Sequence, residues 1–159
     1  MKKALKVTGI SLVAALAALQ LYRPARNTNS APPPPSDIVN AYAVPTDVAF
    51  ALHRACYDCH SNNTHYPWYT NIQPVGIWLA DHIDEGKEEL NFSDFGNFKP
   101  RRKLKKLKEI VDEIEEGAMP LSSYTIMHKE AILQPFEKQM IIDWAKGLTQ
   151  KISLEAGAQ

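Results

Sequence analysis

The chain has 159 residues, equal numbers of basic and acidic side chains (18 of each), and 45% hydrophobic residues. This composition is typical of a folded protein and argues against disorder, while zero formal charge argues against a nucleic-acid partner. The length suits one compact domain with accessory segments.

The N-terminus differs in kind from the rest of the chain. Three lysines in the first six residues precede a mainly apolar run from Val7 to Leu21. This run is short for a membrane span, which needs about 20 residues, and is typical of a signal-peptide core. Residues 1–22 are therefore predicted to be a cleaved export signal or an uncleaved signal anchor, with a buried N-terminal helix as a third reading. Either of the first two places the remainder at the periplasmic face of the membrane or in the periplasm.

Residues 23–46 are predicted to be a proline-rich linker. Pro32–Pro35 would form a stiff polyproline II piece that rises about 3.1 Å per residue. Such a piece would hold a domain away from a membrane surface, and a simple unstructured spacer would do nearly the same.

Residues 47–150 are predicted to form an all-α domain, and residues 151–159 a C-terminal tail. Apolar residues recur at helical spacing, and no stretch shows the sustained alternation of a strand. Gly117 is a natural helix stop, and a proline is favoured in a first turn. The four predicted helices start at Thr46, cover Val75–Leu90, cover Arg101–Glu116, and start near Pro135. The predicted packing residues on these helices include Leu52, Trp78, Leu107, Phe136, Met140, Ile141, Trp144 and Leu148.

The only two cysteines lie in the segment "CYDCH", residues 56–60. A zinc site needs four ligands, and His60 is awkwardly close to Cys59 for the same tetrahedron. A thioredoxin-like pair follows a strand and opens a helix, whereas this pair closes a predicted helix. A disulfide between Cys56 and Cys59 would close a very small loop and constrain the unfolded chain little.

Covalent haem attachment is the chemistry that uses all three of these residues. In the C-x-x-C-H motif each thiol forms a thioether with a haem vinyl group, and the adjacent histidine ligates the iron. The motif therefore predicts one haem c per chain, attached through Cys56 and Cys59, with His60 as the proximal ligand. A bound cofactor would also help a domain of this size to fold.

The sixth iron ligand is less clear from the motif. Met119 lies in "EEGAMPLSSY", a non-helical segment before the last predicted helix, where a thioether could reach the far face of the haem. Met127 and His82 are rivals, His65 and His128 are weaker ones, and core packing is the ordinary role of a methionine.

Longer motifs support this prediction. The chain resembles the haem-binding domain family over about residues 40–148, through the C-x-x-C-H-S start, the "YPWY" box, the "LNFSDF" segment and the "MPLSSY" loop. Members of that family are small exported monohaem proteins similar to cytochrome c. The resemblance implies haem c on Cys56 and Cys59 with His60 proximal, and it supports Met119 as the second ligand. It does not imply a physiological role.

Several further residues are predicted to support the haem. The region of Pro74 is expected to supply a backbone carbonyl for the second ring nitrogen of His60. Aromatic residues that could wall the haem or bond its propionates, with general core packing as the alternative, are Tyr66, Trp68, Tyr69 and Tyr124.

The third predicted helix has its bases first and its acids last, which opposes the helix dipole. A solvated face with pairs such as Lys105–Glu109 and Lys108–Asp112 explains this order. A basic docking patch for a redox partner or for lipid headgroups is the sharper hypothesis, and it includes Lys103 and Lys106.

Together these features predict an exported electron carrier rather than an enzyme, with His60 and Met119 as the axial ligands. A saturated iron leaves no place for a substrate, and a thioether ligand raises the reduction potential. A peroxidase-like enzyme or a gas or redox sensor is the alternative, and each needs a displaceable sixth ligand. The redox partner and the oligomeric state do not follow from the sequence.

Overall fold

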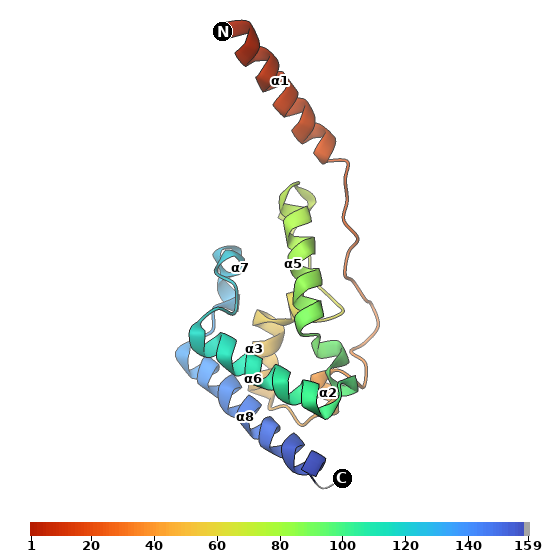
Figure 1. Ribbon diagram of the computed structural model, residues 1–159, viewed down its shortest axis with the longest axis vertical. Helices are drawn as coiled ribbons and strands as arrows, with labels where there is room; N and C mark the ends of the chain where they lie inside the picture. Colours follow the sequence, from red (N-terminus) through yellow and green to blue (C-terminus); the bar gives the residue numbers. More distant parts are fainter. Residues whose placement is uncertain (158–159) are drawn as a thin grey trace.

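The structure is a computed structural model that describes residues 1–157, and over this range it is all-helical with no strand (Figure 1). The prediction of an all-α domain is therefore confirmed. The α-helices are α1 (Lys2–Leu19), α2 (Ile38–Ala41), α3 (Thr46–Ala55), α4 (Tyr57–His60), α5 (Val75–Glu89), α6 (Pro100–Glu116), α7 (Ser122–Met127) and α8 (Pro135–Gly157). Three short 3₁₀ helices lie between them: η1 (Trp68–Asn71), η2 (Phe92–Asn97) and η3 (Lys129–Ala131).

The four predicted helices correspond to α3, α5, α6 and α8, and local chemistry sets their ends. Pro100 and Pro135 are the first residues of α6 and α8, where a missing N–H costs nothing. Gly117 ends α6 in the left-handed conformation with φ 73°, as its position predicted. The last helix continues to Gly157, into the segment predicted to be a C-terminal tail, and Ile152 in that segment is buried.

The apolar core lies where α6 and α8 pack antiparallel, with α3 against them (Figure 1). Leu107, the predicted packing residue of α6, is confirmed as buried, and Ile110 and Ile114 are buried with it. Phe136 was predicted to be buried and is instead 70% exposed. The buried face of α8 begins instead with Glu137, which pairs with Arg54 of α3, and continues with Ile141.

Helix α5 rises from this core, and its N-terminal half exposes Val75 and Trp78 while Gly76 is buried (Figure 1). Ile83 is its buried anchor, whereas Trp78, predicted to pack, is 41% exposed. Within the described residues α5 packs mainly against α4 and η1, and the side of the helix that carries Trp78 stays partly exposed despite its apolar pattern. Gly76 lets η1 lie tightly on the start of α5, because a Cβ atom there would collide with the carbonyl oxygen of Thr70.

The segment between α1 and α2 is fastened along the domain rather than free. The side chain of Asn27 donates to the Ser61 carbonyl (2.8 Å) and the Thr64 hydroxyl (2.9 Å), and it accepts from Lys87 (2.7 Å). Further along, the Ser36 hydroxyl donates to the Ser93 carbonyl at 2.8 Å. These bonds give residues 23–36 a fixed path over the loop that follows His60.

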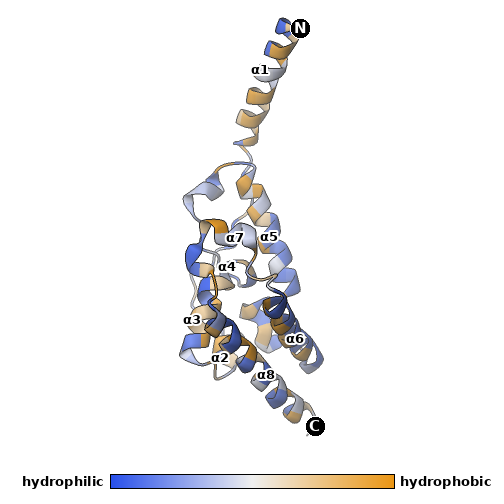
Figure 2. Ribbon diagram, turned by 90° about the vertical axis from the view of Figure 1, so that its left-hand side faces the viewer, coloured by the Kyte–Doolittle hydropathy of each residue, from blue (hydrophilic) through white to orange (hydrophobic). Residues whose placement is uncertain are grey.

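Helix α1 projects from the domain and buries none of its residues. Figure 2 shows apolar residues along most of its length. Among residues 1–157, no helix combines the length and the hydropathy required to cross a membrane.

Candidate haem site

The two cysteines and the histidine lie on one turn of helix. Cys56 ends α3 with φ −129°, and the single turn α4 follows it directly. The amides of Cys59 and His60 donate to the Cys56 carbonyl at 3.2 and 3.0 Å. Residues three and four positions apart share a helix face, so both thiols and the imidazole are presented together. Both cysteines are free.

The ring of His60 is held by the C-terminal end of α5. Its Nδ1–H donates to the carbonyl oxygens of Gly86 (2.8 Å) and Leu90 (3.0 Å). Because both partners are acceptors, Nδ1 carries the proton, and Nε2 keeps its lone pair for a metal. The predicted acceptor near Pro74 is therefore wrong, since α5 brings its far end, not its start, against His60.

Gly86 makes this approach of α5 possible. A Cβ atom at this position would lie 2.8 Å from the carbonyl oxygen of Cys59. That oxygen belongs to the backbone and cannot swing away as a flexible side chain could. Glycine at position 86 thus sets how closely α5 lies against the turn that presents His60.

Two adjoining cavities, of about 340 and 280 Å³, open beside this turn. The first has an apolar wall from the core that includes Leu52, Phe92 and Ile110. Both cavities are lined by Ala55, Cys56, His60, Glu89, Met119 and Pro120, and Cys59 lines the second. A mostly apolar space with a few polar groups is typical of a cofactor site.

Met119 is held between the end of α6 and the cysteine turn. Its amide donates to the Glu113 carbonyl at 3.2 Å. Three residues into α7, the Tyr124 hydroxyl donates to the carboxylate of Asp58 at 2.8 Å. Asp58 lies between the two cysteines, so the Met119 loop is tied directly to the turn that carries them.

The rival ligands are placed less favourably. Met127 is 57% exposed and lines neither cavity. In His128, Nε2 accepts from Tyr69 (2.6 Å) and Nδ1 donates to Glu130 (3.0 Å), so both nitrogens are engaged. His65 lines neither of the two cavities.

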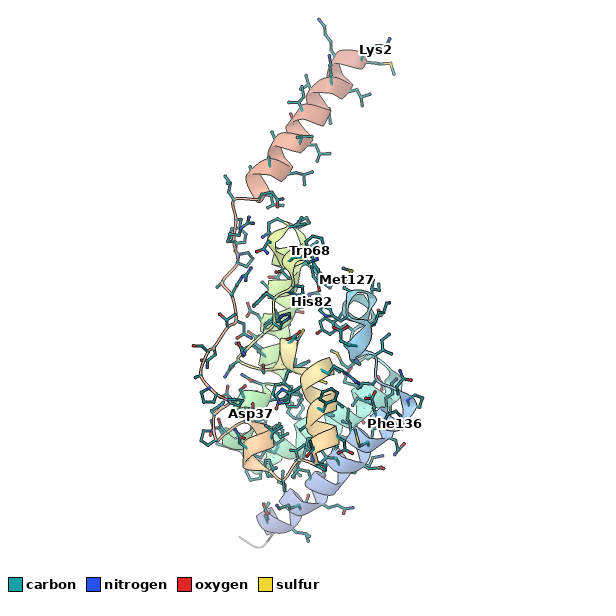
Figure 3. All side chains as sticks on the ribbon, turned by 180° about the vertical axis from the view of Figure 1, so that it is seen from behind. Lys2, Asp37, Trp68, His82, Met127 and Phe136 are labelled. Carbon is teal, nitrogen blue, oxygen red and sulfur yellow. The ribbon has the colours of Figure 1, made fainter. Side chains whose placement is uncertain are left out.

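His82 is the one rival that lines a cavity shared with His60. Its Nδ1–H donates to the Trp78 carbonyl at 2.9 Å, which leaves Nε2 with its lone pair. Figure 3 shows His82 on α5 and Met127 at the end of α7. Geometry thus ranks Met119 first among the candidates and His82 second.

Most of the aromatic residues that were predicted to wall the haem do not line the two cavities. Trp68 is 73% exposed, Tyr66 accepts from the Asn27 amide, and Tyr69 bonds His128. Tyr124 lines the second cavity, but its hydroxyl is committed to Asp58. These side chains fasten loops to one another instead of forming a wall around a ligand.

A buried stack under His60 was not predicted. Asp37, 1% exposed, accepts from the Tyr57 hydroxyl at 2.8 Å and from the Val39 amide at 3.1 Å. Tyr57 stacks on Phe92 (5.0 Å between ring centres), whose edge faces His60 (6.2 Å). Burial, together with the Asp37 carboxylate, raises the pKa of Tyr57. The available signal was the serine–aspartate pair at the end of the proline-rich segment, because aspartate favours a helix N-cap.

The cysteine environment argues against a thiolate site. Burial raises the pKa of Cys56 to about 12 and that of Cys59 to about 11, so both are neutral thiols near pH 7. A redox-active pair needs a lowered thiol pKa. Within residues 1–157, no three His, Cys, Asp or Glu side chains are grouped to hold a metal ion by themselves.

One corner of the first cavity is charged. Lys106, whose side chain is 8% exposed, contacts carboxylate oxygens of Glu89 (3.1 Å) and Glu109 (2.7 Å). The predicted pairs Lys105–Glu109 and Lys108–Asp112 both form along α6. These pairs confirm the solvated face. Lys106 is too buried to belong to the predicted docking patch, and a docking role for the other basic residues, such as Lys103, stays a prediction.

The comparison with known families agrees with this geometry. Residues 14–147 match the haem-binding domain family, and the chain belongs to it. The resemblance noted in the sequence is therefore confirmed, and haem is the cofactor the family name specifies. No curated protein and no solved structure matches the chain.

The residues present fit a haem. Free thiols, an imidazole with a fixed tautomer and a thioether all border connected apolar space, and Phe92 and Ile110 extend the apolar wall. A flat apolar ring requires such a wall, and an iron requires such nitrogen and sulfur donors.

Proposed function

We propose that the protein is a monohaem c-type electron carrier of the cytochrome c class. One observation carries this proposal: Nε2 of His60 keeps its lone pair, and His60 and Met119 line the same two cavities as Cys56. In this reading Cys56 and Cys59 hold the haem covalently, and His60 and Met119 are its axial ligands. Haem bound in this way supplies reversible one-electron chemistry.

The residues of the chain have separable tasks in this function. The backbone carbonyls of Gly86 and Leu90 fix the orientation and the tautomer of the His60 ring. The apolar wall from Leu52, Phe92 and Ile110 keeps water from one side of the site. Burial of the haem and its thioether ligand would both favour a raised reduction potential.

Export is part of the proposal. Haem c is attached outside the cytoplasm, and residues 1–22 have the charge and apolar run of an export signal or signal anchor. Helix α1 buries nothing against the domain, which supports a role for it outside the fold. The carrier would then work in the periplasm or at the periplasmic face of the membrane.

A haem enzyme or sensor is the second candidate, and His82 is the observation that favours it. If Met119 dissociates, His82 Nε2 in the second cavity could serve as a distal base or as a replacement ligand. Both alternative functions require an exchangeable sixth position.

Absorption spectra of protein made with haem c maturation machinery test the proposal. We expect a low-spin spectrum, no response to carbon monoxide, and a weak long-wavelength methionine–iron band in the oxidised form. Met119→Ala should abolish that band, and Met127→Ala, its exposed counterpart, should keep it. Ready carbon monoxide binding by the unaltered protein would favour the enzyme or sensor, and absence of covalent haem would overturn the proposal.

A further inference from the structure

An apolar surface at one end of the domain has no role in the haem site. Its side chains come from η1, the start of α5 and the end of α7, and all are exposed. We call this surface the apolar tip, and it consists of Trp68, Ile72, Val75, Trp78, Ile126 and Met127. Single exposed apolar residues are normal, but a group with two tryptophans marks an interaction surface.

A hydrogen bond joins the two parts of the apolar tip. The Tyr69 hydroxyl donates to His128 Nε2 at 2.6 Å, and this links η1 to the residue that follows α7. Trp68 precedes Tyr69 in sequence and Met127 precedes His128, so the bond holds both apolar groups at the same end. Figure 3 shows Trp68 and Met127 at this end of the molecule.

The same end holds the base of α1. The Gln20 side chain donates to the Gln73 carbonyl (3.0 Å) and accepts from the Gln73 amide (2.9 Å), while the Gln73 side chain donates to the Tyr22 carbonyl (3.1 Å). Gln73 lies between Ile72 and Val75 of the apolar tip. Helix α1 therefore leaves the molecule from the apolar tip, as Figure 1 shows.

The apolar side chains of helix α1 are not packed against the domain. Its apolar residues are exposed on every side, including Val7, Ile10 and Val13. A helix that is apolar all round is stable inside a protein core or in lipid. The apolar tip is thus continuous with an element whose chemistry suits lipid.

The charge pattern selects a lipid surface over other occupants. Residues 59–80 and 117–129, which build the apolar tip, contain no Asp or Glu, although the chain has 18. The carboxylates that border these ranges are Asp58, which is bonded to Tyr124, Glu130, which is bonded to His128, and Asp81, which is exposed on α5 after Trp78. Exposed bases flank the tip at Arg23, Arg26 and Lys129. Tryptophan with nearby basic residues is the usual composition of a surface at the headgroup level of an anionic membrane.

We propose that the apolar tip rests on the surface of a lipid bilayer, at the place where α1 enters it. The inference rests on the part of the proposed function that brings residues 1–22 to a membrane. It adds that the folded domain itself touches lipid, through Trp68, Ile126 and their neighbours. The contact requires only the headgroup region and not a spanning helix.

Quenching of tryptophan by brominated lipid tests this contact in the full-length holoprotein. Vesicles of phosphatidylcholine and phosphatidylglycerol are prepared with and without bromine on the acyl chains. One variant keeps only Trp68 (Trp78→Phe with Trp144→Phe), and its control keeps only Trp144 on α8 (Trp68→Phe with Trp78→Phe). The ratio of emission in the two kinds of vesicle cancels any quenching by haem. We expect about a twofold or greater loss for Trp68, as for a side chain at the headgroup level, and none for Trp144.

A second pair of variants separates docking from mere tethering by α1. In the Trp68-only background, Ile72→Glu with Ile126→Glu should reduce quenching to the Trp144 level. Phe50→Glu with Phe136→Glu changes two apolar residues outside the tip that are at least as exposed, and it should leave quenching intact.

Three results would overturn the proposal. They are Trp68 quenching no greater than that of Trp144, Trp68 quenching that survives the two glutamates in the tip, and a concentration-dependent dimer that the same glutamates abolish. The last would assign the tip to a second copy of the chain. Covalent haem is measured separately on the same samples, so its absence would defeat the proposed function and leave the lipid result readable.

Discussion

The two sides of the candidate haem site are held in different ways. On the proximal side, two backbone carbonyls orient His60, and a glycine lets α5 lie directly against its turn. On the distal side, Met119 lies on a loop that is fixed by its amide bond to Glu113 and by the Tyr124–Asp58 bond. The position of His60 thus depends on close contact between main-chain segments, and that of Met119, the proposed second ligand, on one loop and one side-chain bond.

This difference suggests a division of roles. Contacts between backbones leave little freedom, so His60 should keep its geometry whether or not haem is attached. A loop with few anchors can move at low cost. Changes in ligation should therefore begin at Met119, and changes in haem attachment should begin at the proximal turn.

The strongest way to break the proximal side is Gly86→Ala. The added Cβ would lie 2.8 Å from the Cys59 carbonyl oxygen, and we expect about 3 kcal/mol of destabilisation together with a large fall in haem content. Thermal unfolding and the haem-to-protein ratio measure both effects. Gly147→Ala in α8, where nothing lies within 4 Å, should be neutral or stabilising by up to about 1 kcal/mol. Equal behaviour of the two variants would contradict the role of Gly86.

Tyr124→Phe is the matching change on the distal side. It keeps the ring that stacks on His128 and removes only the bond to Asp58, at a cost of about 2 kcal/mol for a charged acceptor. We expect normal haem content but a methionine–iron band that disappears at lower temperature than in the unaltered protein. Tyr42→Phe serves as the control, because no hydrogen bond of the described residues involves the Tyr42 hydroxyl. A band unchanged by Tyr124→Phe would show that the loop does not need this anchor.

Asn27→Ala tests whether the fastened N-terminal segment supports the proximal side. The change removes three side-chain bonds, two of them to the loop after His60, and local opening should become easier by about 1 kcal/mol. Limited proteolysis within residues 23–36 should accelerate. Asn29→Ala is the matched control, since the Asn29 side chain only accepts from the Ala31 amide, while its main-chain amide keeps its bond to Asn63. Similar cleavage rates in both variants would mean that the segment is held by other contacts.

The smallest effect is expected from a fall in pH that protonates Glu137. This residue pairs with Arg54 and lies outside the candidate haem site. Burial would raise the pKa of Glu137, but the Gln134 amide and the Arg54 guanidinium outweigh it and lower that pKa below its ordinary value. A lowered folded-state pKa gives stability above the unfolded value that is lost as pH falls through the folded one. The melting temperature should therefore decline below about pH 4.5, and less steeply in Glu137→Gln. The same slope in both proteins would exclude this pair as a cause.

The sequence predicted the parts of the fold that depend on local chemistry. Helical spacing located α3, α5, α6 and α8, and Pro135 and Gly117 marked two of their ends. It failed for Trp78 and Phe136, because an amphipathic pattern shows that a face is apolar but not that a partner covers it.

For the candidate site too, the sequence predicted the features set by neighbouring residues and missed those set by distant ones. Adjacent residues of "CYDCH" were enough to suggest haem, and the chain does belong to the haem-binding domain family. The acceptors for His60 lie 26 and 30 residues away on α5, and no local pattern identifies them. Asp37 was overlooked because it follows a run of prolines that reads as a spacer, although it is among the most buried side chains.

The bonds of Gln20, Asn27 and Ser36 have a consequence for how such a carrier would meet its partners. A segment fastened to the domain at three points is not a long flexible linker. The candidate haem cavity would therefore stay at a nearly constant distance from the end of α1 and in a nearly constant orientation. If α1 keeps the protein at a membrane, a membrane-bound redox partner would meet the cavity by diffusion within the plane of that membrane, which is a two-dimensional search. Electrons would then be exchanged at a set distance from the lipid rather than over the whole reach of a flexible linker.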